Sequence, residues 1–145
     1  MSQLMLFTNF DLLNWALLIG RLFIGICFVV HGLGKLGYVG PGNLRGFTEW
    51  LRSLKVPYPE IQAKVAMSIE LGGGACLALG FLARPACVLL IFTMVIAGSI
   101  GHKGGGYLIT NNPPGNEYTI NLAAICFVFL LTGPGIYSVD AIIFG

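Results

Sequence analysis

Four long apolar segments alternate with shorter polar connections along this chain. The first runs from about residue 12 to 34, and three more cover about residues 60–82, 85–102 and 117–133. Each has close to the ~20 apolar residues that a helix needs to cross a hydrocarbon core of about 30 Å. The pattern therefore predicts an all-α membrane protein, a bundle of four transmembrane helices. Asp11 is expected to cap the first of them.

The connection between the first two segments is long enough to hold an element of its own. Apolar residues recur at helical spacing on one side of residues 43–54, namely Leu44, Phe47, Leu51 and Leu54. Arg45, Glu49 and Arg52 fall on the other side, and Asn43 stands at the N-cap position. This predicts an amphipathic helix. Trp50 and the basic face of this helix suit a location at the membrane interface. Two alternatives are a lid over the bundle end and an ordinary surface helix between spans.

The first apolar segment carries a stripe of distinctive residues on one face. Asn14, Arg21 and Phe28 recur at a spacing of seven, with Gly25 and Gly32 close to the same stripe. Small residues at such positions let a second helix approach closely. We therefore expect this face to pack inside the bundle.

Arg21 lies inside the first apolar segment, where placing an arginine in the membrane costs a free energy of roughly 2.5 to 3.5 kcal/mol. We therefore expect its guanidinium to face the protein interior and to bind an acceptor there. Glu70 is the acidic residue at the centre of another apolar segment. Counted from the expected span starts, both residues lie near mid-depth. We expect Arg21 and Glu70 to pair, either as a purely structural ion pair or as part of a ligand- or proton-handling site.

The composition agrees with a membrane location. Hydrophobic residues make up 56% of the chain and charged residues 10%, against about 25% charged in an ordinary soluble domain. Mean hydropathy is +0.84. The net charge of +2 is too small and dispersed to indicate nucleic-acid binding. Residues 1–145 are interpreted as a single membrane domain.

Cysteine and metal chemistry receive little support from the sequence. The four cysteines lie within apolar runs and none is spaced CxxC: Cys27, Cys76, Cys87 and Cys126. They are interpreted as small buried hydrophobic residues, although a disulfide between helices stays open. No ExxH pair is present to build a di-iron bundle site, so no metal site is expected.

Alternating helix directions bring several polar residues to one end of the bundle. They are His31, Lys35, Lys64, His102, Lys103 and Glu117. We predict one polar pocket, with His31, His102 and Glu117 as the candidate catalytic residues. The candidate ligand-binding residues are Arg21, Glu70, Lys35 and Asn121. The plainer alternatives are a histidine satisfied by a backbone carbonyl, and His102 and Glu117 lying in solvent.

Basic residues indicate an orientation. The first and third connections carry Lys35, Arg45, Arg52, Lys55, Lys64 and Lys103, whereas the opposite side has Arg84. Positive residues favour the cytoplasmic side of a membrane. The first and third loops are therefore predicted to be cytoplasmic, with both termini on the other side.

These residues together resemble the DoxX family of small four-helix membrane proteins. The resemblance covers the chain from about Leu17 to Asp140. It rests on the order of Arg21, His31-Gly32 and Lys35, then Ile69-Glu70-Leu71-Gly72-Gly73, Leu79-Gly80 and Arg84, then His102, Glu117, Gly133-Pro134-Gly135 and Ser138-Val139-Asp140.

The resemblance implies a multi-pass protein of the bacterial cytoplasmic (inner) membrane, often tied to quinone chemistry. Members include a subunit of a thiosulfate:quinone oxidoreductase, and others are associated with the detoxification of catechols or hydroquinones. In a quinone site, His31 and His102 would donate to the quinone oxygens and Glu117 or Glu70 would relay protons. Arg21 would hold Glu70 ionised.

Three functions stay open at this stage. A quinone-interacting subunit needs an electron source, and because no flavin, haem or iron–sulfur motif is visible, electrons would come from a partner redox subunit or a reduced substrate. A small proton-coupled transporter needs a carboxylate that is free to protonate. The transporter hypothesis is therefore favoured if Arg21 does not contact Glu70. A non-catalytic assembly subunit would use these polar residues for packing alone. A homo-oligomer is also open.

Overall fold

A computed structural model describes the backbone of residues 2–145 and the side chains of residues 10–145. The helices are α1 (Ser2–Leu36), α2 (Leu44–Ser53), α3 (Pro59–Leu79), α4 (Ala83–Ile96), the π-helical segment η1 (Ala97–Gly101), α5 (Glu117–Thr132) and α6 (Val139–Phe144). No strand occurs in the described part of the chain. The all-α prediction is confirmed.

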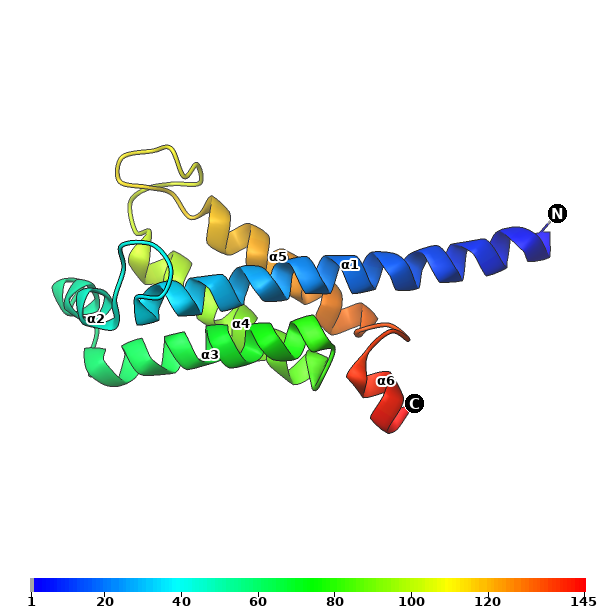
Figure 1. The fold of residues 1–145 in the computed structure, drawn as a ribbon. Coiled ribbons are helices and arrows are strands. Elements are labelled where there is room, and N and C mark those ends of the chain that lie inside the picture. Colours follow the sequence, from blue (N-terminus) through cyan, green and yellow to red (C-terminus); the bar gives the residue numbers. More distant parts are fainter. Residues whose placement is uncertain (1) are drawn as a thin grey trace.

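The four long helices form an elongated bundle (Figure 1). α1 lies alongside α3, α3 contacts α4, and α4 packs on α5. α2 covers the end where α1 finishes and α3 begins, and the connection between η1 and α5 lies at the same end. The N-terminal part of α1 extends beyond the bundle at the opposite end, where α6 also lies.

Two helix boundaries show how local sequence sets the ends. α1 begins at Ser2 and runs through Asp11, so the prediction that Asp11 caps this helix is wrong. Neither proline nor glycine interrupts residues 2–19, and nothing there stops a helix. Asn43 does cap α2 as predicted, because its side-chain oxygen accepts from the backbone N–H of Gly46 at 2.8 Å.

One apolar core joins the four long helices. Phe28 of α1, Leu77 of α3, Leu90 of α4 and Cys126 of α5 are fully buried within it. The four cysteines are free thiols, and Cys87 and Cys126 fill core positions as small apolar side chains.

Large apolar side chains also cover the outside of the bundle. Residues Phe10–Leu36 and Ala83–Gly101 are long and apolar enough to cross a membrane, with mean hydropathies of 2.1 and 1.9. Only 28% and 33% of the residues in an 18-residue apolar window of each stretch are buried inside the molecule. An apolar surface of this extent is expected to face lipid or another apolar partner.

Glycines set the distance between α1 and α3. A Cβ placed on Gly25 would lie 2.5 Å from the carbonyl oxygen of Gly74 and 2.6 Å from the backbone nitrogen of Ala78. A Cβ on Gly32 would meet Leu71 at 2.5 Å. The predicted packing face of the first helix is therefore confirmed, and these contacts fix the register of the antiparallel pair.

The C-terminal segment is fastened to the end of the bundle opposite α2. The Asp140 carboxylate accepts from the backbone N–H groups of Leu82 at 2.7 Å and Ala83 at 3.0 Å, at the start of α4. The Trp15 and Tyr137 rings are also in contact, with centroids 4.9 Å apart and planes tilted by 42°. A carboxylate at this position satisfies free N–H groups and interacts favourably with the helix dipole.

Replacing Asp140 with alanine should therefore lower the free energy of unfolding by about 1–2 kcal/mol, the usual cost of losing a helix cap. The measurement is chemical unfolding of the purified protein in detergent, followed by circular dichroism. Asp11→Ala is the matched control, because Asp11 lies exposed on α1. Equal unfolding curves for the two variants would show that the Asp140 contact contributes nothing.

Candidate functional site

Lys35 and Glu70 form an ion pair between α1 and α3 at the α2 end of the bundle. Glu70 is buried with 4% of its surface exposed, and the side chain of Lys35 is 18% exposed. The Lys35 ammonium also lies 4.9 Å from the centroid of the Phe47 ring, on α2. Lys35 is thus held between a buried carboxylate and an aromatic face.

The predicted pair of Arg21 and Glu70 is wrong. Arg21, 2% exposed, donates to the carbonyl oxygen of Ala78 at 2.7 Å and to that of Tyr137. Its Nε has no hydrogen-bond partner within the described residues. Ala78 is eight residues beyond Glu70, which is about 12 Å along a helix, so Arg21 belongs to the end that holds the C-terminal segment.

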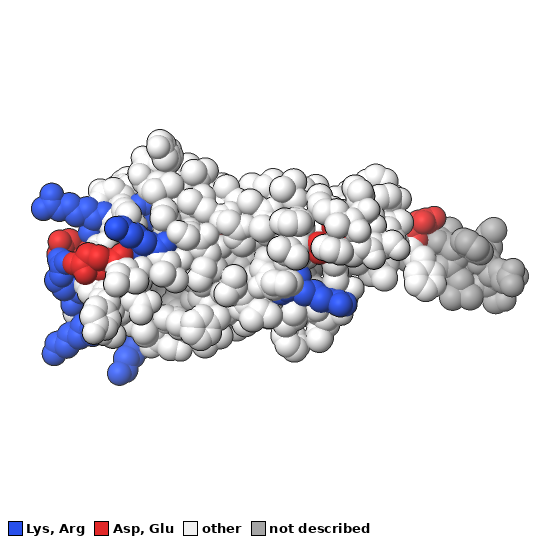
Figure 2. All heavy atoms as spheres, turned by 90° about the horizontal axis from the view of Figure 1, so that it is seen from below, with Lys and Arg blue, Asp and Glu red and all other residues white. Residues whose placement is uncertain are grey.

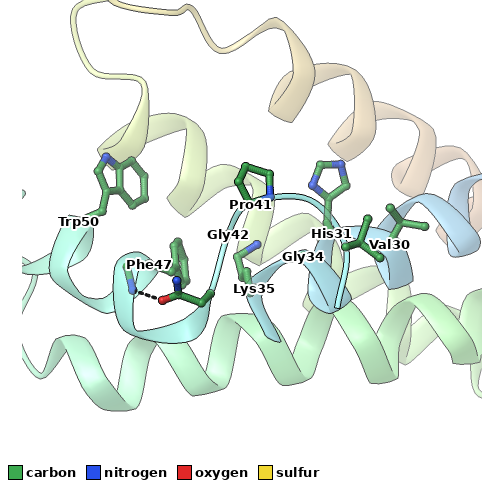
Figure 3. A pocket seen from close by; sticks show the side chains of 11 residues that line it. Val30, His31, Gly34, Lys35, Pro41, Gly42, Phe47 and Trp50 are labelled. Carbon is green, nitrogen blue, oxygen red and sulfur yellow. Dashed lines mark hydrogen bonds between the residues drawn. The ribbon is translucent and has the colours of Figure 1, made fainter. Parts of the chain in front are cut away.

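A pocket of about 570 Å³ opens between the end of α1, the connection after it and α2 (Figure 3). Its lining residues are Val30, His31, Gly34, Lys35, Val39, Pro41, Gly42, Asn43, Gly46, Phe47 and Trp50. His31 and Lys35 are one helical turn apart, so both reach the pocket from one face of α1. Phe47 and Trp50 stack with centroids 5.8 Å apart and provide an aromatic wall from α2.

The ends of η1 and α5 meet this region through two aromatic contacts. The His31 ring contacts Tyr118, the second residue of α5, with a centroid distance of 4.9 Å and ring planes tilted by 47°. A Cβ on Gly101 would lie 2.6 Å from the Trp50 ring, so α2 also rests on the end of η1. α2 therefore closes the bundle end through Trp50 as well as through its apolar side.

The remaining predicted site residues hold the connection between η1 and α5. His102 Nδ1 lies 3.1 Å from the carbonyl oxygen of Pro114. The Glu117 carboxylate accepts from the backbone N–H of Ile109 at 3.2 Å, and the Asn121 side-chain oxygen accepts from the Tyr107 hydroxyl at 3.2 Å. These contacts order a loop, and none of the three residues lines the pocket. A direct role for them toward a ligand stays a prediction.

Sequence reasoning missed three members of this site. Phe47 and Trp50 were expected on the amphipathic helix without a role as pocket walls, and Tyr118 was not expected to contact His31. The spacing of His31 and Lys35 was the available signal for the pocket, because it places both on one helical face. Nothing in the sequence pairs Tyr118 with His31, since that contact depends on how α5 sits against α1.

The helical bundle and its outer apolar surface define a small helical membrane protein, and residues 16–103 match the DoxX family. That match covers more than half of the chain, which therefore belongs to the DoxX family. The chain is also similar to "Inner membrane protein YphA" of Escherichia coli (strain K12), with 28% identity over 127 residues. The alignment covers 86% of this chain and 87% of that relative. No solved structure matches the chain.

Proposed function

We propose that the chain is a four-span protein of the bacterial inner membrane whose α2-covered pocket binds the head group of a quinone or a similar small aromatic redox ligand. α3 and α5, of 21 and 16 residues, supply the second and fourth spans beside α1 and α4. α2 then lies at the interface and covers the pocket mouth. The gathering of basic residues at this end supports a cytoplasmic position for it.

The observation that carries the proposal is the placing of two hydrogen-bond donors in an aromatic pocket. His31 and Lys35 both line it, together with Phe47 and Trp50 of α2. The volume of about 570 Å³ lies in the usual range for small-ligand pockets. A quinone presents two carbonyl acceptors on a flat ring, which matches a pocket that holds both hydrogen-bond donors and aromatic faces.

The same residues provide suitable chemistry for a ligand that gains electrons. Negative charge developing on a quinone oxygen would be stabilised by the Lys35 ammonium. The His31 imidazole could donate a proton to that oxygen. Glu70 orients Lys35, and Lys35 takes the place beside Glu70 that the sequence analysis gave to Arg21. Electrons would come from a partner redox subunit or a reduced substrate.

The transporter alternative was expected to gain if Arg21 did not contact Glu70. Arg21 does not contact Glu70 and donates to the carbonyl oxygen of Ala78 instead. The Glu70 carboxylate forms an ion pair with Lys35. A carrier cycle that used Glu70 would have to break this buried ion pair in each turn, which costs free energy. The ion pair therefore favours a binding pocket over an alternating proton carrier.

The two tryptophans allow a direct binding test. Trp50 lines the pocket, whereas Trp15 contacts Tyr137 at the other end of the bundle. In a Trp15→Phe background, a short-tailed quinone should quench the fluorescence of Trp50 with saturation. His31→Ala in that background should weaken the apparent affinity by about five- to ten-fold, which corresponds to one hydrogen bond.

Trp50→Phe is the matched control, because it keeps only the distant Trp15 as a reporter. It should show the weak, unsaturable quenching of a quinone dissolved in detergent. Equal quenching of the two tryptophans, or an unchanged affinity in His31→Ala, would contradict the proposed pocket. Extraction of the purified wild-type protein should also yield co-purified quinone. The same titration with His102→Ala tests the predicted role of the second histidine.

A further inference from the structure

Exposed cations gather at the α2 end of the molecule. Figure 2 shows blue side chains around this end, and a long uncharged surface beside it. The exposed basic residues on α2, on α3 and in the adjoining connections are Arg45, Arg52, Lys55, Lys64 and Lys103. Arg84 is the exposed basic residue at the end where α4 begins.

Two nearby glutamates both form ion pairs with the same one of these cations. Arg52 donates to Glu49 at 2.6 Å and also pairs with Glu60. These hydrogen bonds, the one to Glu49 first, raise the pKa of the Arg52 guanidinium. Within the described part of the chain, Arg45, Lys55, Lys64 and Lys103 form no ion pair. Four cations are therefore available to an anionic partner.

Aromatic side chains with polar tips accompany the cations. Tyr38, Trp50, Tyr58 and Tyr107 are all exposed at this end, with Tyr38 at 80% and Tyr58 at 75%. Tyrosine and tryptophan are enriched where a membrane protein meets the lipid head groups. An acidic protein partner would use the cations but would leave these exposed aromatic residues unexplained.

We propose that this basic and aromatic end, defined by Arg45, Lys55, Lys64, Lys103 and the exposed Tyr38 and Tyr58, binds anionic phospholipid head groups. Lysine and arginine attract the lipid phosphate at the surface of a membrane, and the tyrosine hydroxyls add hydrogen-bond donors at the same depth. This inference uses only the membrane location of the chain and is independent of the ligand in the α2-covered pocket.

The test uses the full chain purified in a neutral detergent, with phosphatidylglycerol or phosphatidylcholine added. Native mass spectrometry counts retained lipid, and thermal unfolding reports the stabilisation. Phosphatidylglycerol should be preferred, and salt of about 0.5 M should weaken the preference by screening. The combined variant Arg45→Gln, Lys64→Gln and Lys103→Gln should reduce the preference by about ten-fold or more.

Arg84→Gln is the matched control, because it removes one exposed cation from the opposite end and should leave the preference unchanged. The proposal is overturned if the triple variant keeps the wild-type preference, if Arg84→Gln loses as much, or if both lipids are retained equally. Equal stabilisation by inorganic phosphate alone also overturns it, because the site would then bind a free anion. Quinone binding to Trp50 is read separately, so either proposal can fail without the other.

Discussion

Replacing Gly74 with alanine is expected to separate α1 from α3 and to lower the free energy of unfolding by about 1–3 kcal/mol, the usual cost of overpacking a tight contact. The new Cβ would lie 2.7 Å from the carbonyl oxygen of Gly25 and 2.8 Å from the Cβ of Phe28. Both atoms are fixed to the α1 backbone, so no rotamer change relieves the clash. The helix itself must move, and the close-packed interface transmits that movement.

Gly72→Ala is the matched control, since it makes the same substitution two residues away on the same helix. A Cβ on Gly72 would meet nothing within 4 Å, and alanine is better than glycine in a helix by about 1 kcal/mol. Gly72→Ala should therefore be neutral or stabilising. Unfolding in detergent, followed by circular dichroism, measures both variants. A Gly74→Ala protein as stable as Gly72→Ala would mean that the close approach at Gly25 does not hold the bundle together.

The helices and their buried faces were largely predictable from sequence. The seven-residue spacing of Asn14, Arg21 and Phe28 identified the inward face of α1, and Arg21 and Phe28 are indeed buried. The Asn14 side-chain oxygen accepts from the backbone N–H of Ile136 at 3.1 Å. Periodicity of this kind depends only on helix geometry and on the difference between apolar and polar side chains. The inward face of a helix can therefore be predicted without any knowledge of the neighbouring helices.

The pairing of charges was less predictable because it depends on the register between helices. Counting residues from the expected span starts placed Arg21 and Glu70 at equal depth, although the starts were uncertain. The contact of Gly25 with Gly74 sets the true register. This register puts Glu70 within reach of Lys35. Aligning the two helices with Gly25 opposite Gly74 would have predicted the contact between Lys35 and Glu70 from sequence.

The loop residues show a second limit of sequence reasoning. His102, Glu117 and Asn121 were expected beside His31 because the same end of the bundle holds them all. Their side chains instead contact the connection between η1 and α5. A loop rich in glycine, asparagine and proline leaves many backbone groups without helical partners, and polar side chains at its ends satisfy them. Sharing an end of the bundle is therefore weaker support for a site than sharing a helical face.

Removing Lys35 is expected to have a large effect, because it leaves the Glu70 carboxylate buried without a partner. Lys35→Met should lower the free energy of unfolding by roughly 3 kcal/mol, in line with other broken buried ion pairs. Glu70→Leu alone should also destabilise, since it leaves the Lys35 ammonium with only the Phe47 ring beside it. Unfolding of both variants in detergent gives these two free energies.

The combined variant Lys35→Met and Glu70→Leu separates the ion pair from the packing around it. If the two charges need each other, the double variant should recover most of the stability lost in either single variant. Arg52→Gln is the matched control, because the Arg52 pairs are exposed and should have little measurable effect on unfolding. Additive losses in the double variant would contradict a mutual dependence of Lys35 and Glu70. Recovered stability together with lost quinone binding would instead mean that the charged pair is kept for the ligand, because two apolar side chains could hold the helices without it.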